Sequence, residues 1–186
     1  MGMDINISYL METADIISLM LLVTLYFCNK QCMSDDRDME FIMRMMTITA
    51  ISNVAGIVFH HFNLNSGLVP KTLVFLSGTW LFFGIVLFGY IWVKFLVTHM
   101  NIPFTSARKR LYQAIILIAF VLIIINLFYP LVFSNSDGVY RRGPAYIVFY
   151  LFVSFYIVDS MVLYVRCRKK IGTLKLFPVQ VCLVPI

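Results

Sequence analysis

The sequence predicts an all-α protein, a polytopic transmembrane helix bundle, on three observations. The 186 residues are 61% hydrophobic and only 13% charged, whereas a soluble domain has about a quarter charged residues. The mean hydropathy is +0.88. The charged residues cluster between apolar runs that reach the ~20 residues a helix needs to cross the hydrocarbon core. Strands of a β-barrel would be about half as long and would alternate apolar with polar side chains, so helices are predicted.

Five apolar runs of spanning length follow one another, at about 9–27, 41–60, 73–97, 111–133 and 146–165. The first lacks the basic leader and the cleavage site of a signal peptide, so we expect it to remain in the protein. A sixth run, 176–186, is too short to cross, and we expect it to be the start of a sixth helix in a fragment. No Pro- or Gly-rich linker divides the chain, so residues 1–186 are predicted to form one domain.

The basic residues predict the orientation in the cell membrane. Two alternating sets of loops and helix ends hold the Lys and Arg residues, twelve in one set and three in the other. The larger set is Lys30, Arg37, Arg44, Lys94, Arg108, Lys109, Arg110, Arg166, Arg168, Lys169, Lys170 and Lys175, and the smaller is Lys71, Arg141 and Arg142. Because short cytoplasmic loops are rich in Lys and Arg, the larger set is predicted to be cytoplasmic and the N-terminus to lie outside.

Enzymatic, metal and nucleic-acid functions find little support in the residues. There is no nucleophile–base arrangement, phosphate-binding loop, HExxH motif or carboxylate pair, so neither catalytic residues nor a cofactor are predicted. His60 and His61 belong to the predicted outer face and His99 to the inner face, which argues against a shared metal. The net charge of +6 reflects basic residues at helix ends, so no nucleic-acid partner is predicted.

Asp159 is the strongest candidate for a functional residue, because a carboxylate inside a span costs roughly 2.5 kcal/mol or more and usually faces the bundle interior. It lies six residues before the predicted boundary at Val165, or roughly 9 Å inside the membrane at 1.5 Å per residue. Three aromatic residues share its helix face at spacings of three and four. The whole face is Phe149, Phe152, Tyr156 and Asp159.

Two interpretations of this face remain open. It is either a ligand pocket or polar switch, or a packing contact in which Asp159 is hydrogen-bonded to a neighbour at similar depth. Thr47, Thr49 and Lys94 are the candidate neighbours, and we prefer this simpler interpretation. In both cases we expect the carboxyl group to be protonated or hydrogen-bonded, because an isolated buried carboxylate is costly.

The segment 137–144, DGVYRRGP, is the most distinctive motif. Asp-Gly predicts a tight turn, and Gly-Pro predicts a second turn where a helix can begin. A short basic loop (99–110) precedes it, and a helix ending in VRCRKK and the sequence KLFPVQVCLVPI follow. This order resembles the seven-helix N-terminal membrane sensor region of bacterial GGDEF diguanylate cyclases and histidine kinases. The residues that match the loop pattern are Gly138, Tyr140, Gly143 and Pro144.

The resemblance implies that the chain is the sensory input domain of a bacterial signal-transduction protein, truncated before its last helices and its output domain. A diguanylate cyclase output, and therefore cyclic-di-GMP signalling, is preferred to a histidine kinase. It implies a homodimer, because two GTP-loaded domains must meet, and a small-molecule or membrane stimulus. Two other classes stay open: part of a transporter, which would show several intramembrane charges and broken helices, and a membrane anchor without a ligand.

Overall fold

The computed structural model describes residues 2–32, 36–62, 68–136 and 139–168. These residues form five helices and a hairpin of two short strands. The elements are α1 (Gly2–Cys32), α2 (Asp36–Phe62), α3 (Leu68–His99), α4 (Ser106–Phe128), β1 (Phe133–Ser136), β2 (Val139–Arg142) and α5 (Tyr146–Arg168). The prediction of an all-α helix bundle is confirmed.

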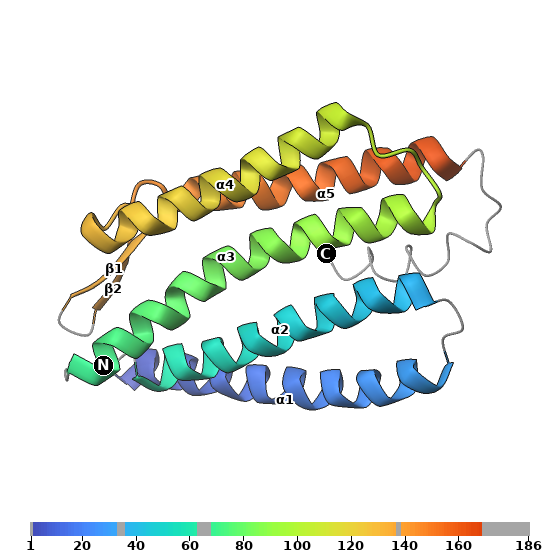
Figure 1. Ribbon diagram of the computed structural model, residues 1–186. Coiled ribbons are helices and arrows are strands. Elements are labelled where there is room, and N and C mark those ends of the chain that lie inside the picture. The colour runs from blue at the N-terminus through green and yellow to red at the C-terminus, as the bar shows by residue number, and fades with distance from the viewer. Residues whose placement is uncertain (1, 33–35, 63–67, 137–138, 169–186) are drawn as a thin grey trace.

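Helix α3 is the centre of the bundle (Figure 1). It packs against α2, α4 and α5, while α1 packs on α2. In the view of Figure 1, α1 and α2 lie below α3, and α4 and α5 lie above it. Every helix that follows another along the chain runs in the opposite direction, so the loops alternate between two ends of the molecule.

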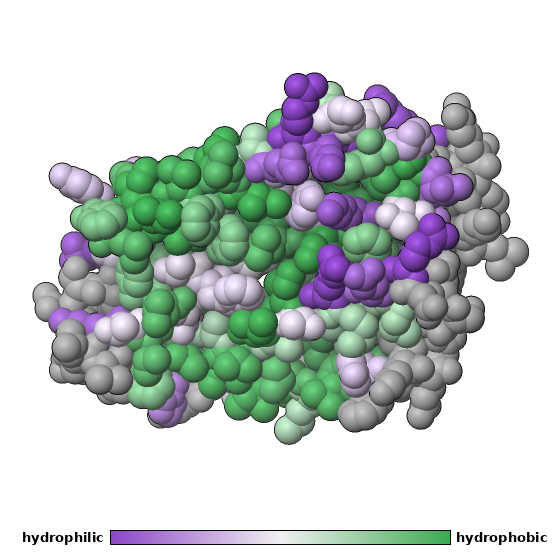
Figure 2. All heavy atoms as spheres, viewed as in Figure 1, coloured by the Kyte–Doolittle hydropathy of each residue, from purple (hydrophilic) through white to green (hydrophobic). Residues whose placement is uncertain are grey.

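Among the described residues, four helices are long and apolar enough to cross a membrane: Arg37–Phe62, Lys71–His99, Ser106–Phe128 and Tyr146–Arg166. Helix α1 is continuous over 31 residues, and its described apolar stretch is Thr13–Tyr26. The molecule is therefore a multi-pass membrane protein. Large apolar side chains cover much of the outer surface of α1, α4 and α5, as the green areas of Figure 2 illustrate. The predicted sixth run lies outside the described residues.

The two ends of the bundle differ in character. We call the end with the starts of α2 and α4 and the ends of α3 and α5 the basic end. The opposite end is the hairpin end, because β1 and β2 lie there. At the basic end, His99 Nδ1 lies 2.6 Å from Asp38 Oδ2, which joins α3 to α2. Beside this pair, Met45 packs with Leu96 in a small apolar cluster.

The predicted fourth span, 111–133, is displaced toward the N-terminus in the structure. Helix α4 begins at Ser106 and ends at Phe128. Pro130 explains the end, because a residue before proline avoids helical dihedral angles, and Tyr129 is extended at φ −129° and ψ 127°. The early start has a larger consequence. Arg108, which the sequence placed in a loop, lies in the first turn of a membrane helix.

The connection between α4 and α5 is a β-hairpin, whereas the sequence predicted only turns. The strands are antiparallel and pair from Phe133–Arg142 to Ser136–Val139. The Asp-Gly turn lies outside the described residues. Asn126 of α4 anchors the first strand, since its Oδ1 accepts hydrogen bonds from the backbone N–H of Val132 at 2.7 Å and of Phe133 at 3.2 Å.

Helices α3 and α5 approach each other closely at Gly89, where the ring of Tyr156 occupies the space of a side chain. A Cβ on Gly89 would lie 2.5 Å from Tyr156 Cδ2 and 2.9 Å from its Cγ. Because Tyr156 is almost fully buried, the ring has little room to move aside. The absence of a side chain at position 89 therefore sets the spacing between these two helices.

We expect Gly89→Ala to destabilise the protein, although alanine favours helices by about 1 kcal/mol over glycine. Overpacking of a filled core costs about 1–3 kcal/mol. Thermal unfolding in detergent checks the result. In a Tyr156→Ala background the same substitution should be neutral or stabilising, because its obstacle is gone. A Gly89→Ala protein as stable as the wild type would contradict the close approach.

Candidate functional site

Asp159 is held by two side chains of the neighbouring helix α4. Arg108 Nη2 donates a hydrogen bond to Asp159 Oδ1 at 2.7 Å, and the hydroxyl of Tyr112 donates to Asp159 Oδ2. The side chain of Asp159 is 13% exposed and that of Arg108 is 22% exposed, so most of the ion pair is shielded. We call Arg108, Tyr112 and Asp159 the polar triad.

Helical spacing brings the two donors to one place. Arg108 and Tyr112 are four residues apart on α4, which puts them on the same face one turn apart. Tyr112 also begins the buried face of α4, which continues as Ile115, Ala119, Ile123 and Asn126. The face is apolar except near its two ends. At one end of the face Tyr112 contacts Asp159 of α5, and at the other end Asn126 contacts the hairpin.

Aromatic rings enclose the triad. Tyr112 is fully buried and stacks on Phe104, with ring centroids 5.9 Å apart, and on Tyr156, at 5.5 Å. The hydroxyl of Tyr156 is buried and has no hydrogen-bond partner among the described residues. Rings that exclude water strengthen the electrostatic attraction between Arg108 and Asp159. An unpaired buried hydroxyl beside them is a costly feature.

The expectation that the Asp159 carboxyl group is hydrogen-bonded agrees with this geometry, but its expected partners were wrong. The hydroxyls of Thr47 and Thr49 donate to carbonyl groups of their own helix, those of Met43 and Met45. Lys94 places its Nζ 4.7 Å from the ring centroid of Tyr90. Both donors to Asp159 come from α4, whereas none of the predicted partners lies on that helix.

The predicted aromatic face of α5 is inward-facing but filled. Phe149 and Tyr156 are each 2% exposed, and Phe152 packs beside them partly buried. The Phe149 ring lies 5.3 Å from that of Phe82. Only Tyr156 reaches the polar triad, through its stacking on Tyr112. A small groove of about 170 Å³ between α3 and α5 passes Phe149, and is lined by Leu81, Phe82, Ile85, Phe149, Tyr150 and Val153.

The described residues of the loop motif belong to the hairpin and to the turn that follows it, at the end of the bundle opposite to Asp159. Tyr140 packs its ring against those of Phe133 and Phe59. Burial raises the pKa of the Tyr140 phenol, and the neighbouring Arg142 acts in the opposite direction. The carbonyl oxygen of Gly143 accepts a hydrogen bond from the backbone N–H of Tyr146 at 3.2 Å. This bond closes the predicted turn at Pro144. Gly138 lies outside the described residues.

A second interior acid, Asp15, was not singled out from the sequence. Its carboxyl group lies against Gly56 of α2. One turn away, Asn53 Nδ2 donates a hydrogen bond to Ser18 Oγ at 2.9 Å, so polar side chains of α1 contact α2 at two successive turns. The sequence did contain an indication of this contact, because Asp15 is an acid within the apolar run 9–27 and lies three residues before Ser18 on the same helix face.

Within the described part of the chain, no group of three or more His, Cys, Asp or Glu side chains could hold a metal ion. His60 and His61 lie in the last turn of α2 at the hairpin end. His99 lies at the basic end, where it pairs with Asp38. Comparisons of the chain with protein-family models, with curated proteins and with solved structures found no match.

Proposed function

We propose that this chain is the membrane-embedded sensory input domain of a bacterial signalling protein whose output domain is a diguanylate cyclase. The polar triad is the single observation that favours a sensory function. A charged pair inside a membrane bundle is costly, and such pairs belong to functional sites more often than they serve helix packing alone. Here it joins α4 to α5 near the basic end of the bundle, the end that the proposed orientation places on the same side of the membrane as the output domain.

The triad has the properties of a two-state element. Arg108 lies in the first turn of α4 and is 22% exposed, so its long side chain can leave Asp159 and reach the membrane interface. In the paired state α4 and α5 are joined at the basic end. In the unpaired state this joint is lost, and the two helices can shift against each other. A stimulus that stabilises one packing more than the other changes the populations of both.

The position of Asp159 on α5 suits transmission of such a shift. Nine residues separate it from Arg168 at the end of the helix, which is about 14 Å at 1.5 Å per residue. A rotation or translation of α5 at the triad is therefore passed on by less than three helical turns. In the proposed parent protein the helices that follow α5 would carry this shift to the output domain, and in a homodimer such shifts change how two output domains meet.

The proposed orientation places the hairpin end outside the cell and the basic end in the cytoplasm, with the N-terminus outside. Single cysteines in a cysteine-free protein test it. Arg141→Cys on β2 and Lys109→Cys on α4 replace exposed residues at opposite ends of the bundle. We expect an impermeant thiol reagent to label Arg141→Cys in intact cells and Lys109→Cys only after the cells are opened. The reverse pattern would overturn the orientation.

The output is tested with the complete natural reading frame, expressed in a bacterium that lacks its own diguanylate cyclases. We expect the cells to accumulate cyclic di-GMP. Tyr112→Phe removes one hydroxyl from the triad and should change the cyclic di-GMP level several-fold. The matched control, Tyr146→Phe, removes a hydroxyl that is hydrogen-bonded to Tyr150 at the hairpin end, far from the triad, and should leave the level unchanged.

Two outcomes would contradict the proposal. If the reading frame stops at or directly after codon 186, the chain has no output domain to control. If cyclic di-GMP stays at the background level, the output is not a diguanylate cyclase. Phosphate transfer from ATP to a histidine of the same protein would then support the alternative, a histidine kinase sensor. Equal effects of Tyr112→Phe and Tyr146→Phe would remove the triad from signalling.

A further inference from the structure

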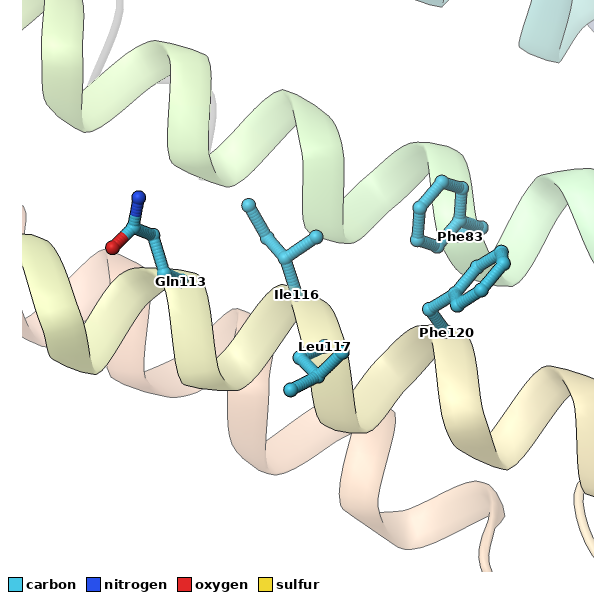
Figure 3. Close-up of a pocket in the computed structure, with 5 residues that line it drawn as sticks. All are labelled: Phe83, Gln113, Ile116, Leu117 and Phe120. Atoms are coloured by element: carbon cyan, nitrogen blue, oxygen red, sulfur yellow. The ribbon is translucent and has the colours of Figure 1, made fainter.

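An open groove of about 270 Å³ lies between α3 and α4. Its lining consists of Phe83 from α3 and of Gln113, Ile116, Leu117 and Phe120 from α4. Figure 3 shows Gln113 and Ile116 directed from α4 toward α3, with the rings of Phe83 and Phe120 side by side farther along. These two rings lie 6.0 Å apart. The groove is apolar except for the single amide of Gln113.

The groove continues a stripe of changing polarity along α4. Lys109 and Arg110 are exposed and lie four and three residues before Gln113, respectively, so all three occupy neighbouring positions on one side of the helix. Leu117 is 62% exposed and Phe120 is 49% exposed. From the basic end inward, the stripe presents two cations, then an amide, then apolar side chains. Figure 2 shows the hydrophilic surface at the start of α4 giving way to a hydrophobic one.

This order matches the parts of a phospholipid at the depths where a bilayer holds them. The step from the cations to Gln113 is about 5 Å at 1.5 Å per residue. The polar layer on each side of a bilayer is about 5–8 Å thick. Cations at its surface meet phosphate groups, an amide below them meets ester carbonyls, and the apolar groove lies at the depth of acyl chains.

We propose that the groove between α3 and α4 binds one acyl chain of an anionic phospholipid, whose headgroup is held by Lys109 and Arg110 and whose ester carbonyl accepts a hydrogen bond from Gln113. Arg108 takes no part, because Asp159 already holds it. The two cations have no acid on their own side within the first two turns of α4, and the positive end of the α4 dipole adds to their field. The occupant is therefore anionic. This site is independent of the proposed signalling function.

Native mass spectrometry of the full chain in detergent tests the site, with phosphatidylglycerol and phosphatidylcholine added separately. We expect phosphatidylglycerol to bind at least tenfold more tightly, because each Lys or Arg near an anionic surface adds measurable attraction. The double variant Lys109→Gln/Arg110→Gln should lose this preference. The control Arg44→Gln/Arg166→Gln also removes two exposed cations from the basic end, but off the stripe, and should keep it.

A second variant reports on the acyl chain. Leu117→Trp places an indole in the groove, and phosphatidylglycerol with brominated acyl chains should quench the added fluorescence more strongly than brominated phosphatidylcholine. Equal affinity for the two lipids in the wild type would overturn the proposal. So would an equal loss of preference in both double variants, which would indicate only net charge. Absence of quenching at position 117 by either lipid would show that protein, from this chain or a second copy, covers the groove.

Discussion

Replacement of Asp159 by leucine is expected to lower the free energy of unfolding by about 3 kcal/mol. Removal of one partner from a buried ion pair costs about 3–5 kcal/mol, because the other charge stays buried without compensation. Arg108 is 22% exposed and can partly recover its solvation at the interface, which favours the lower end of that range. Tyr112 also loses the acceptor of its buried hydroxyl. Denaturant unfolding in mixed micelles measures the change.

Asp159→Asn is the matched control for this prediction. Asparagine has nearly the same shape and keeps an oxygen that can accept one hydrogen bond from Arg108 or Tyr112. We therefore expect about half the loss seen with leucine, since the neutral amide gives up the charge-assisted part of the contact. If leucine and asparagine both left stability unchanged, the carboxyl group would have to be in contact with water, contrary to its 13% exposure.

Gly143→Ala is expected to displace the hairpin from its contact with the end of α4. A Cβ at this position would collide with the carbonyl oxygen of Leu131, and would lie 2.5 Å from the carbonyl carbon of Leu131 and 2.7 Å from the carbonyl oxygen of Pro130. Overpacking usually costs about 1–3 kcal/mol, and the obstacle here is backbone that cannot change rotamer. We expect a loss of about 3 kcal/mol in unfolding free energy.

The loss should be local as well as global. Hydrogen exchange should accelerate at the N–H groups of Val132 and Phe133, because displacement of the hairpin takes them from Asn126 Oδ1. Pro144→Ala alters the exposed neighbouring position and should change stability by no more than about 0.5 kcal/mol. Wild-type exchange rates in Gly143→Ala would show that position 143 tolerates a side chain and that the turn is not tightly packed.

The sequence predicted the helical bundle well because length and hydropathy are properties of each segment alone. A run of about 20 apolar residues must satisfy its backbone polar groups internally in lipid, and a helix does so without reference to its neighbours. The limits of α4 were harder, because apolar residues continue past Phe128 to Phe133. The change of backbone at Tyr129 comes from Pro130, whose effect is steric and does not alter hydropathy.

Asp159 was found from sequence because it interrupts an apolar run, but its partners were not. Arg108 and Tyr112 are 51 and 47 positions away along the chain, and only the packing of α4 beside α5 brings them close. A signal was nevertheless present. Tyr112 and Asn126 interrupt the apolar face of α4 near its two ends, and Arg108 precedes Tyr112 by one turn. Polar residues that share a buried helix face require partners, and this criterion would have placed Arg108 in the site.

The assignment of Asp159 and Arg108 to one coupled unit between α4 and α5 is tested most directly by a double-mutant cycle of Arg108→Leu and Asp159→Leu. Because a buried ion pair can be replaced by apolar residues at little cost, we expect the double variant to be more stable than either single variant. The coupling energy should therefore be at least about 3 kcal/mol, the size of the loss expected for Asp159→Leu alone and the upper end of the range for residues in direct contact. Losses that add to within about 0.5 kcal/mol, as independent sites do, would contradict the pairing and the two-state element based on it.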